Sequence, residues 1–189
     1  MIKTRWYPAQ QWHHCAGLSE QTATWLLDST SLTQRLQLLC PDFFNVEVLT
    51  QQWQHPLLSE KAWLKISAQH HVRIREVYLR CKTNAWVFAR TVIPPQTLTG
   101  KYRRLANLGK HPLGHILFAE RTVQRRAFYI ARLTMGHPLY QLATQRLSEK
   151  PAMLWARRSI FYLLDNPLLI NEVFLPSFQL MLTQQSIGN

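Results

Sequence analysis

A glutamate lies inside the most hydrophobic strand that this chain can form, and that position constrains the fold. Residues 168–176 read Leu-Leu-Ile-Asn-Glu-Val-Phe-Leu-Pro, a run that is typical of a buried strand. Because side chains alternate along a strand, Glu172 shares a face with Ile170 and Phe174. The chain has only ten acidic residues. An ionised carboxylate on an apolar face is costly unless it is paired or hydrogen-bonded, so we expect Glu172 to meet a specific partner.

A second strand carries the opposite charge in the same way. Residues 74–79 read Ile-Arg-Glu-Val-Tyr-Leu, which places Arg75 on one face with Val77 and Leu79. An arginine and a glutamate that point into one apolar cavity would suit a small aromatic acid with a carboxylate at one end and a hydroxyl at the other. The alternative is that Glu172 pairs with an arginine in a bridge that only stabilises the fold, since buried charges are usually paired.

The length and composition indicate one globular domain over residues 1–189. A chain of 189 residues with 47% hydrophobic and 17% charged residues can bury a single sizeable core. No segment reaches the apolar length of a membrane span, so we expect no stable membrane insertion. The N-terminus lacks the apolar core of a signal peptide. Cys15, Cys40 and Cys81 are odd in number and far apart, so the sequence predicts no disulfide, no metal site and a location in the reducing cytoplasm.

The net charge of +12 favours an anionic partner, either a nucleic acid, an acidic lipid or an acidic metabolite. Lysines and arginines are scattered in short clusters such as Arg125-Arg126 and Arg157-Arg158, and at least one residue of the second cluster should be structural or exposed. A nucleic-acid interface would need a basic stripe interleaved with exposed aromatic side chains, which the sequence does not show. We therefore expect a small acidic ligand and no nucleic acid.

Breakers and periodicity predict an α+β fold with a largely antiparallel sheet and helices inserted between strand pairs. Ser31 and Gln34 fit a capping box, which starts a helix near Leu32. The predicted strands cover residues 44–49, 72–79, 85–93, 126–133, 155–163 and 168–175. The predicted helical segments are two short helices within 19–39, then 98–108, 112–118 and 139–147. Residues 50–62 should be irregular.

Taken in order, a set of short motifs resembles the bacterial chorismate–pyruvate lyases, and it covers residues 17 to 178. The matching segments are Gly17-Leu18; Ser31-Leu32-Thr33-Gln34-Arg35-Leu36; Arg75-Glu76-Val77-Tyr78-Leu79; Trp86; Ala89-Arg90-Thr91-Val92-Ile93-Pro94; Leu108-Gly109-Lys110-His111-Pro112-Leu113-Gly114; Leu154-Trp155-Ala156-Arg157-Arg158-Ser159; and Leu168-Leu169-Ile170-Asn171-Glu172-Val173-Phe174-Leu175-Pro176. No single motif is diagnostic, but their ordered set is specific.

The resemblance implies a monomeric, cofactor-free enzyme that converts chorismate to 4-hydroxybenzoate and pyruvate for ubiquinone synthesis. It implies that Arg75 binds the aromatic carboxylate and that Glu172 faces the ring hydroxyl. It further implies a backbone contact from Leu113 in one flap, with Leu32 in the other flap. Aromatisation drives this reaction, so the enzyme can act mainly by positioning, an effect of up to about 7–11 kcal/mol.

Chorismate has two carboxylates, so we expect a second cation. Arg90 is the candidate because it shares a strand face with Trp86 and Phe88, although that face could be the outer one. The alternative function is a non-catalytic domain that binds a small aromatic acid, as in transcription regulators whose ligand-binding modules have the same fold. Such regulators carry a helix-turn-helix ahead of the module, and about 16 residues before the first motif are too few for it.

Overall fold

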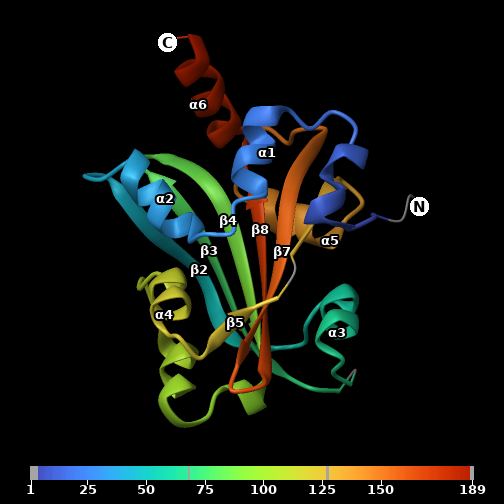
Figure 1. Ribbon diagram of the computed structural model, residues 1–189, viewed down its shortest axis with the longest axis vertical. Helices are drawn as coiled ribbons and strands as arrows, with labels where there is room; N and C mark the ends of the chain where they lie inside the picture. Colours follow the sequence, from blue (N-terminus) through green and yellow to red (C-terminus); the bar gives the residue numbers. More distant parts are fainter. Residues whose placement is uncertain (1–3, 68, 127, 188–189) are drawn as a thin grey trace.

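A single antiparallel sheet dominates the computed structural model, which describes residues 4–67, 69–126 and 128–187 (Figure 1). The strands follow the spatial order β1-β6-β7-β8-β4-β3-β2, and β5 pairs with β7 beside this path. Their bounds are β1 Tyr7–Pro8, β2 Phe44–Gln54, β3 Val72–Cys81, β4 Asn84–Ile93, β5 Val123–Arg125, β6 Tyr129–Thr134, β7 Met153–Leu163 and β8 Asn166–Phe174. The predicted α+β class with an antiparallel sheet is confirmed.

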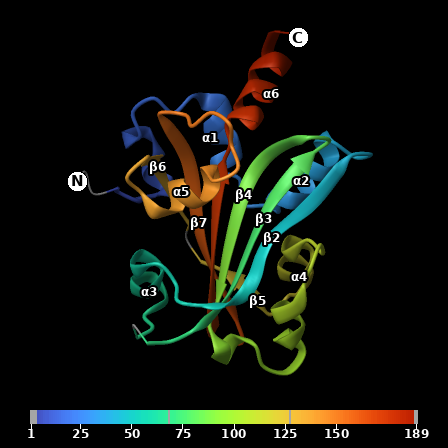
Figure 2. The same ribbon diagram turned by 180° about the vertical axis from the view of Figure 1, so that it is seen from behind.

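Helices cover both faces of this sheet (Figures 1 and 2). The α-helices are α1 Glu20–Leu26, α2 Leu32–Leu39, α3 Leu58–Leu64, α4 Leu113–Ala119, α5 Pro138–Thr144 and α6 Pro176–Ile187, and the 3-10 segments are η1 Ala9–His14, η2 Pro95–Thr97 and η3 Gly100–Asn107. Within the described ranges, no helix is both long and apolar enough to cross a membrane.

The strand register brings the two predicted charged positions onto one face. Val77 of β3 pairs with Ala89 of β4, Ala89 pairs with Glu172 of β8, and Glu172 pairs with Arg157 of β7. Side chains of directly paired residues lie on the same face, so this row crosses four strands on one side of the sheet. Helices α2 and α4 lie over that side, and we call them the lid (Figure 1).

Short turns fix the two hairpins that carry the charged strands. Lys82, at φ 53°, begins the turn between β3 and β4, in agreement with the predicted hairpin. Leu164 and Asp165 both have positive φ between β7 and β8. A two-residue type I′ turn requires positive φ at both central residues. This turn is favoured in hairpins because its backbone twist matches the twist of the flanking strands. This turn comes one residue before the predicted one.

Several segments differ from the sequence-based expectation. Residues 50–62 are not irregular, because β2 extends to Gln54 and α3 follows it. Helix α6 was also not predicted, although Phe178 and Leu182, four residues apart, are both buried. The expected strand 126–133 includes residue 127, which lies outside the described residues, and the observed strand β6 begins at Tyr129.

The prediction that no disulfide forms is wrong, since Cys40 and Cys81 are bonded with their Cα atoms 5.9 Å apart. These residues are 41 positions apart in sequence, but Cys40 ends α2 just before β2 begins, and Phe44 of β2 pairs with Cys81 of β3. The strand pairing therefore brings the two thiols together. The bond between Cys40 and Cys81 also removes the basis for expecting a reducing compartment, which was that the cysteines are unpaired.

Candidate active site

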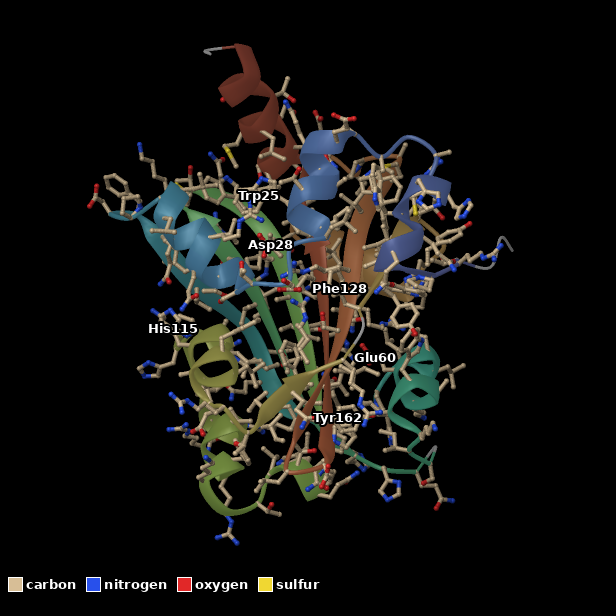
Figure 3. The ribbon with its side chains drawn as sticks, viewed as in Figure 1. Trp25, Asp28, Glu60, His115, Phe128 and Tyr162 are labelled. Atoms are coloured by element: carbon tan, nitrogen blue, oxygen red, sulfur yellow. A yellow bond between two sulfur atoms is a disulfide. The ribbon has the colours of Figure 1, made fainter. Side chains whose placement is uncertain are left out.

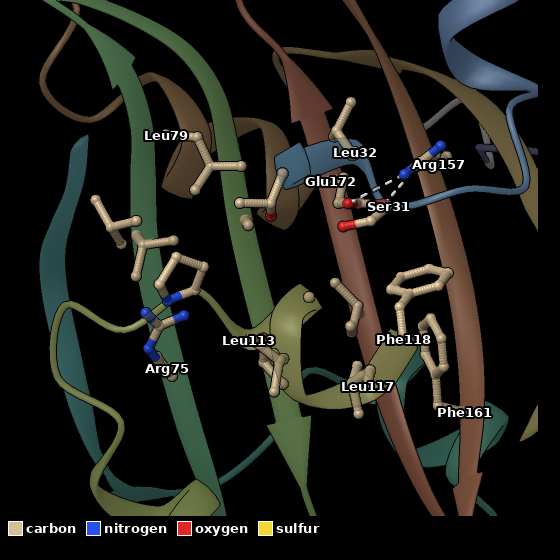
Figure 4. A pocket seen from close by; sticks show the side chains of 18 of the residues that line it. Ser31, Leu32, Arg75, Leu79, Leu113, Leu117, Phe118, Arg157, Phe161 and Glu172 are labelled. Atoms are coloured by element: carbon tan, nitrogen blue, oxygen red, sulfur yellow. Dashed lines mark hydrogen bonds and ion pairs between the residues drawn. The ribbon is translucent and has the colours of Figure 1, made fainter. Parts of the chain in front are cut away.

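A cavity lies between the lid and the charged face of the sheet (Figure 4). Its wall combines apolar side chains from both layers with four ionisable groups, which are Arg75, Arg125, Arg157 and Glu172. The remaining lining residues are Ser31, Leu32, Thr33, Val46, Val77, Leu79, Ala89, Thr91, Pro112, Leu113, Gly114, Leu117, Phe118, Phe161 and Ile170. A mostly apolar wall with a few polar groups is typical of a site for a small organic ligand.

Arg75 lies at one end of the cavity as a buried cation (Figure 4). The residue is 3% exposed, and its guanidinium donates to the carbonyl oxygens of Gly109 and His111 at 3.0 and 3.1 Å. Its Nε has no hydrogen-bond partner among the described residues, and none of them forms an ion pair with it. Burial lowers the pKa of Arg75 to about 10, so the side chain remains charged at neutral pH. A carboxylate is the partner that this fork of donors fits.

Glu172 lies across the cavity from Arg75, where Arg157 holds it (Figure 4). Arg157 donates to both carboxylate oxygens through Nε and its terminal nitrogen, the second contact being 3.3 Å. Arg157 also donates to the carbonyls of Trp25 and Asp28. The pairing that we considered as an alternative therefore exists, yet the Glu172 side chain keeps 14% of its surface exposed and still lines the cavity. An ionised carboxylate in that position is an acceptor for a ligand hydroxyl.

The lid supplies the other two predicted positions. Leu32 is the first residue of α2, and Leu113 is the first residue of α4, and both line the cavity. Ser31 caps α2 as predicted, with its hydroxyl accepting from the Gln34 backbone N–H at 3.4 Å. A Cβ added at Gly114 would lie 2.8 Å from the Ser31 hydroxyl, so the two lid helices make close contact at this glycine.

Arg90, the predicted second cation, does not reach the cavity. Its guanidinium lies on the opposite face of the sheet, where it pairs with Glu60 at 2.8 Å and with Glu76 at 2.5 Å. A β-bulge between Leu79 and Arg80 explains the difference. Without the bulge the hairpin would pair Arg75 with Arg90, whereas the observed register pairs Arg75 with Thr91. A one-residue shift of this kind moves every following side chain to the other face.

Arg125 and Arg157 are the cations that the cavity contains instead, and neither was predicted to line it. Strand alternation in the Trp155–Phe161 segment places Arg157 and Phe161 on one face and Arg158 on the other. Both members of the Arg157-Arg158 pair are buried. A signal for Arg157 was present in the sequence, because Glu172 needed a buried partner and β7 directly precedes β8.

Comparison with known proteins gives consistent matches over most of the chain. Residues 2–185 match the family model described as chorismate lyase. The probable chorismate pyruvate-lyase of Nitrosomonas eutropha is 39% identical over 153 residues, which cover 81% of this chain and 85% of that protein. The probable chorismate pyruvate-lyase of Methylococcus capsulatus is 40% identical over 154 residues, which cover 82% and 94% respectively.

Solved structures share the fold at much lower identity. The crystal structure of the PhnF C-terminal domain superposes with a TM-score of 0.55 at 15% identity, covering 74% of this chain and 88% of that one. A GntR-family transcriptional regulator from Bacillus cereus gives a TM-score of 0.51 at 9% identity, covering 71% and 93%. At these identities the likeness shows the fold alone. The family model and the relatives at 39–40% identity also show the family: the chain belongs to the chorismate lyase family.

Proposed function

We propose that this protein is a chorismate lyase, which converts chorismate to 4-hydroxybenzoate and pyruvate. Residues 1–189 act as one chorismate lyase-like domain, and substrate and product bind in the cavity beneath the lid. The cavity encloses a cation and an anion at opposite ends of an apolar space. This is the arrangement that a para-hydroxybenzoate ring requires.

The observation that carries the proposal is the unneutralised charge of Arg75. Its guanidinium is 3% exposed, and the described residues offer it two carbonyl oxygens but no partner for Nε. A buried charge of this kind opposes folding unless an anion binds to it. The carboxylate that substrate and product share supplies that anion. Leu113 and Leu32 then close the lid over the ring.

The chemistry requires little from the protein beyond orientation. The bond between the ring carbon and the ether oxygen of the side chain breaks, and the ring loses the hydrogen at the carbon that carries the hydroxyl. The methylene carbon of the side chain gains one hydrogen and becomes the methyl group of pyruvate. Hydrogen can pass within the substrate, so we propose that Glu172 orients the hydroxyl by accepting its hydrogen bond. Aromatisation supplies the driving force, and we propose that no cofactor takes part.

A non-catalytic ligand-binding domain is the less favoured function. The regulators that share the fold are only 9–15% identical to this chain, whereas the curated relatives at 39–40% identity are named chorismate pyruvate-lyases. Either kind of protein would bind an aromatic acid in this cavity. Turnover therefore separates the two functions.

The test is to incubate the full chain with chorismate and to follow 4-hydroxybenzoate by absorbance and pyruvate by a coupled assay. We expect the two products in equal amounts, unchanged by excess chelator. Arg75→Met is the matched negative control, and Arg126→Met, which removes an exposed charge, is the positive one. Binding of 4-hydroxybenzoate without turnover of chorismate would support the non-catalytic alternative, and loss of activity in chelator that one divalent metal restores would contradict a cofactor-free reaction.

A further inference from the structure

The substrate of the proposed reaction carries one more carboxylate than its aromatic product. In chorismate the ring carboxylate lies para to the hydroxyl, and the side chain with the second carboxylate leaves the ring beside that hydroxyl. If Arg75 binds the ring carboxylate and Glu172 binds the hydroxyl, the second carboxylate must lie at the Glu172 end. The cation that meets it must therefore come from that end of the cavity.

Two arginines lie there, and their hydrogen bonds differ. Arg157 is committed to the carboxylate of Glu172 and to two backbone carbonyls. Within the part of the chain that the structure describes, Arg125 bonds only to neutral groups. It donates to the Ser159 hydroxyl at 2.8 and 3.2 Å and to the Ser29 carbonyl at 2.9 Å. These three bonds leave two of the five guanidinium N–H groups free for a ligand.

Strand pairing and aromatic contacts hold Arg125 in this position. It is the last residue of β5 and pairs with Phe161 of β7, which also lines the cavity. Its guanidinium carbon lies 4.5 Å from the centre of the Phe128 ring, labelled in Figure 3, and 5.5 Å from that of Phe161. Burial, and secondarily the charge of Arg157, lower the pKa of Arg125 to about 10, so it is ionised at neutral pH.

The charge of the cavity wall agrees with a ligand that has two negative charges. Three arginines and one glutamate line it, which leaves a net charge of +2. Chorismate is a dianion, whereas 4-hydroxybenzoate with a neutral hydroxyl has one negative charge. One positive charge in the wall is therefore unmatched when only the product is bound.

We propose that Arg125 binds the side-chain carboxylate of the substrate and so distinguishes chorismate from 4-hydroxybenzoate. This inference rests on the proposed function. It assigns to Arg125 a contact that exists in the substrate complex and is lost when pyruvate leaves. Arg75, by contrast, contacts a carboxylate that remains throughout the reaction.

The experiment compares two stable ligands by calorimetry on the full chain. The first is 3-(carboxymethoxy)-4-hydroxybenzoate, which has both carboxylates, and the second is 4-hydroxy-3-methoxybenzoate, which has only the ring carboxylate. Wild-type protein should bind the diacid more tightly. Arg125→Met should weaken binding of the diacid by about tenfold to a hundredfold, the range for loss of a charge-assisted hydrogen bond, and should change binding of the monoacid by less than about threefold. The kcat/KM for chorismate should fall by a similar factor, with the affinity for 4-hydroxybenzoate unchanged.

Two further variants act as controls. Arg126→Met removes an exposed arginine that lies 4.4 Å from the Tyr162 ring and outside the cavity, and it should change none of these values. Arg125→Lys keeps the charge without the planar fork, and it should give a smaller loss that is still confined to the diacid. If Arg125→Met does not fold, the affinities of Arg125→Lys for the two ligands test the role of Arg125.

The outcomes separate this inference from the proposed function. If Arg125→Met loses equal affinity for both ligands, or loses affinity for neither, the proposed role of Arg125 is wrong even if wild-type protein turns chorismate over. If wild-type protein makes no 4-hydroxybenzoate but Arg125→Met still abolishes the preference for the diacid, the proposed function fails and the dicarboxylate site stands.

Discussion

The two faces of the sheet carry neighbouring rows of charged side chains, and only one row is electrically complete. On the face opposite the lid, Glu76 pairs with Arg90, Arg90 with Asn171, and Asn171 with Arg158 along the strand register. Glu60 of α3 joins this row, accepting from Arg90 at 2.8 and 3.0 Å and from Asn171 at 2.9 Å. Two arginines and two glutamates give this network no net charge.

On the lid face the wall of the cavity has a net charge of +2. Among the described residues, Arg75 and Arg125 bond only to neutral groups, as Arg158 does within the uncharged network of the other face. Arg75 and Arg157 are as buried as the arginines of the opposite face, whereas Arg125 and Glu172 are half-buried, so burial of the arginines alone does not separate the two rows. The difference is whether the protein itself supplies the counter-charge. Where it does, the ionic network attaches a helix to the sheet, and where it does not, a ligand must supply the missing charge. Four changes to the chain test this distinction.

Glu60→Ala should have the largest effect, and the effect should be on stability. Arg90 keeps Glu76 in this variant, but the buried network is left with a net charge of +1. Loss of one partner from a buried ionic network costs about 3–5 kcal/mol. Urea unfolding of the variant and of Glu149→Ala, a change at an exposed glutamate, measures it. The affinity of the folded variant for 4-hydroxybenzoate should match that of wild type. If Glu60→Ala is as stable as Glu149→Ala, the attachment of α3 to the sheet does not depend on the ionic network.

The lid is attached differently, because Cys40 bonds α2 covalently to the end of β3. The Cys40→Ser/Cys81→Ser double variant should lose about 2–4 kcal/mol of stability, since the bond closes a long loop in the unfolded chain. Thermal unfolding with and without reductant provides the check. Reductant should destabilise wild type and leave the double variant unchanged. Identical unfolding of reduced and oxidised wild type would contradict a stabilising bond.

Arg75→Met should show the reverse of Glu60→Ala. The affinity for 4-hydroxybenzoate should fall by roughly 1.5–3 kcal/mol, the range for a hydrogen bond to a charged group. The free energy of unfolding without ligand should change by less than about 1 kcal/mol, because burial already lowers the pKa of Arg75 and disfavours its ionised form in the folded state. Calorimetry and urea unfolding on one preparation give both numbers. A large loss of stability with unchanged affinity would make Arg75 a structural residue.

Glu172→Gln should have the smallest effect on turnover and on product binding, although it leaves the buried Arg157 without its carboxylate partner. Glutamine keeps an acceptor oxygen, and Arg157 keeps the carbonyls of Trp25 and Asp28. If Glu172 only orients the hydroxyl, turnover should fall about tenfold or less, on the scale of one neutral hydrogen bond. Steady-state kinetics, together with product affinity as the control, test this role. A fall of several orders of magnitude with product affinity intact would mean that Glu172 transfers a proton.

One part of this distinction, the orientation of Arg75 and Glu172, could be predicted from the sequence, because strand alternation is a local property. The apolar neighbours of Arg75 and Glu172 in their own strands identified both as inward-facing residues. The position of Arg90 could not be predicted, since it depends on the bulge between Leu79 and Arg80. Glu60 was missed because residues 50–62 show little periodicity, and only tertiary contacts reveal that its carboxylate is fully buried.

The disulfide also limits how the lid can move. Helix α2 has eight residues, so at 1.5 Å per residue it is about 12 Å long. Its C-terminal end is fixed to the sheet at Cys40, while Ser31 and Leu32 at its other end lie over the cavity. Any rotation of α2 would therefore be centred on its disulfide-bonded C-terminal end. A rotation of about 20° about that end would move the Ser31 end by about 4 Å, which would separate Ser31 from Gly114 of α4 while Cys40 stays in place.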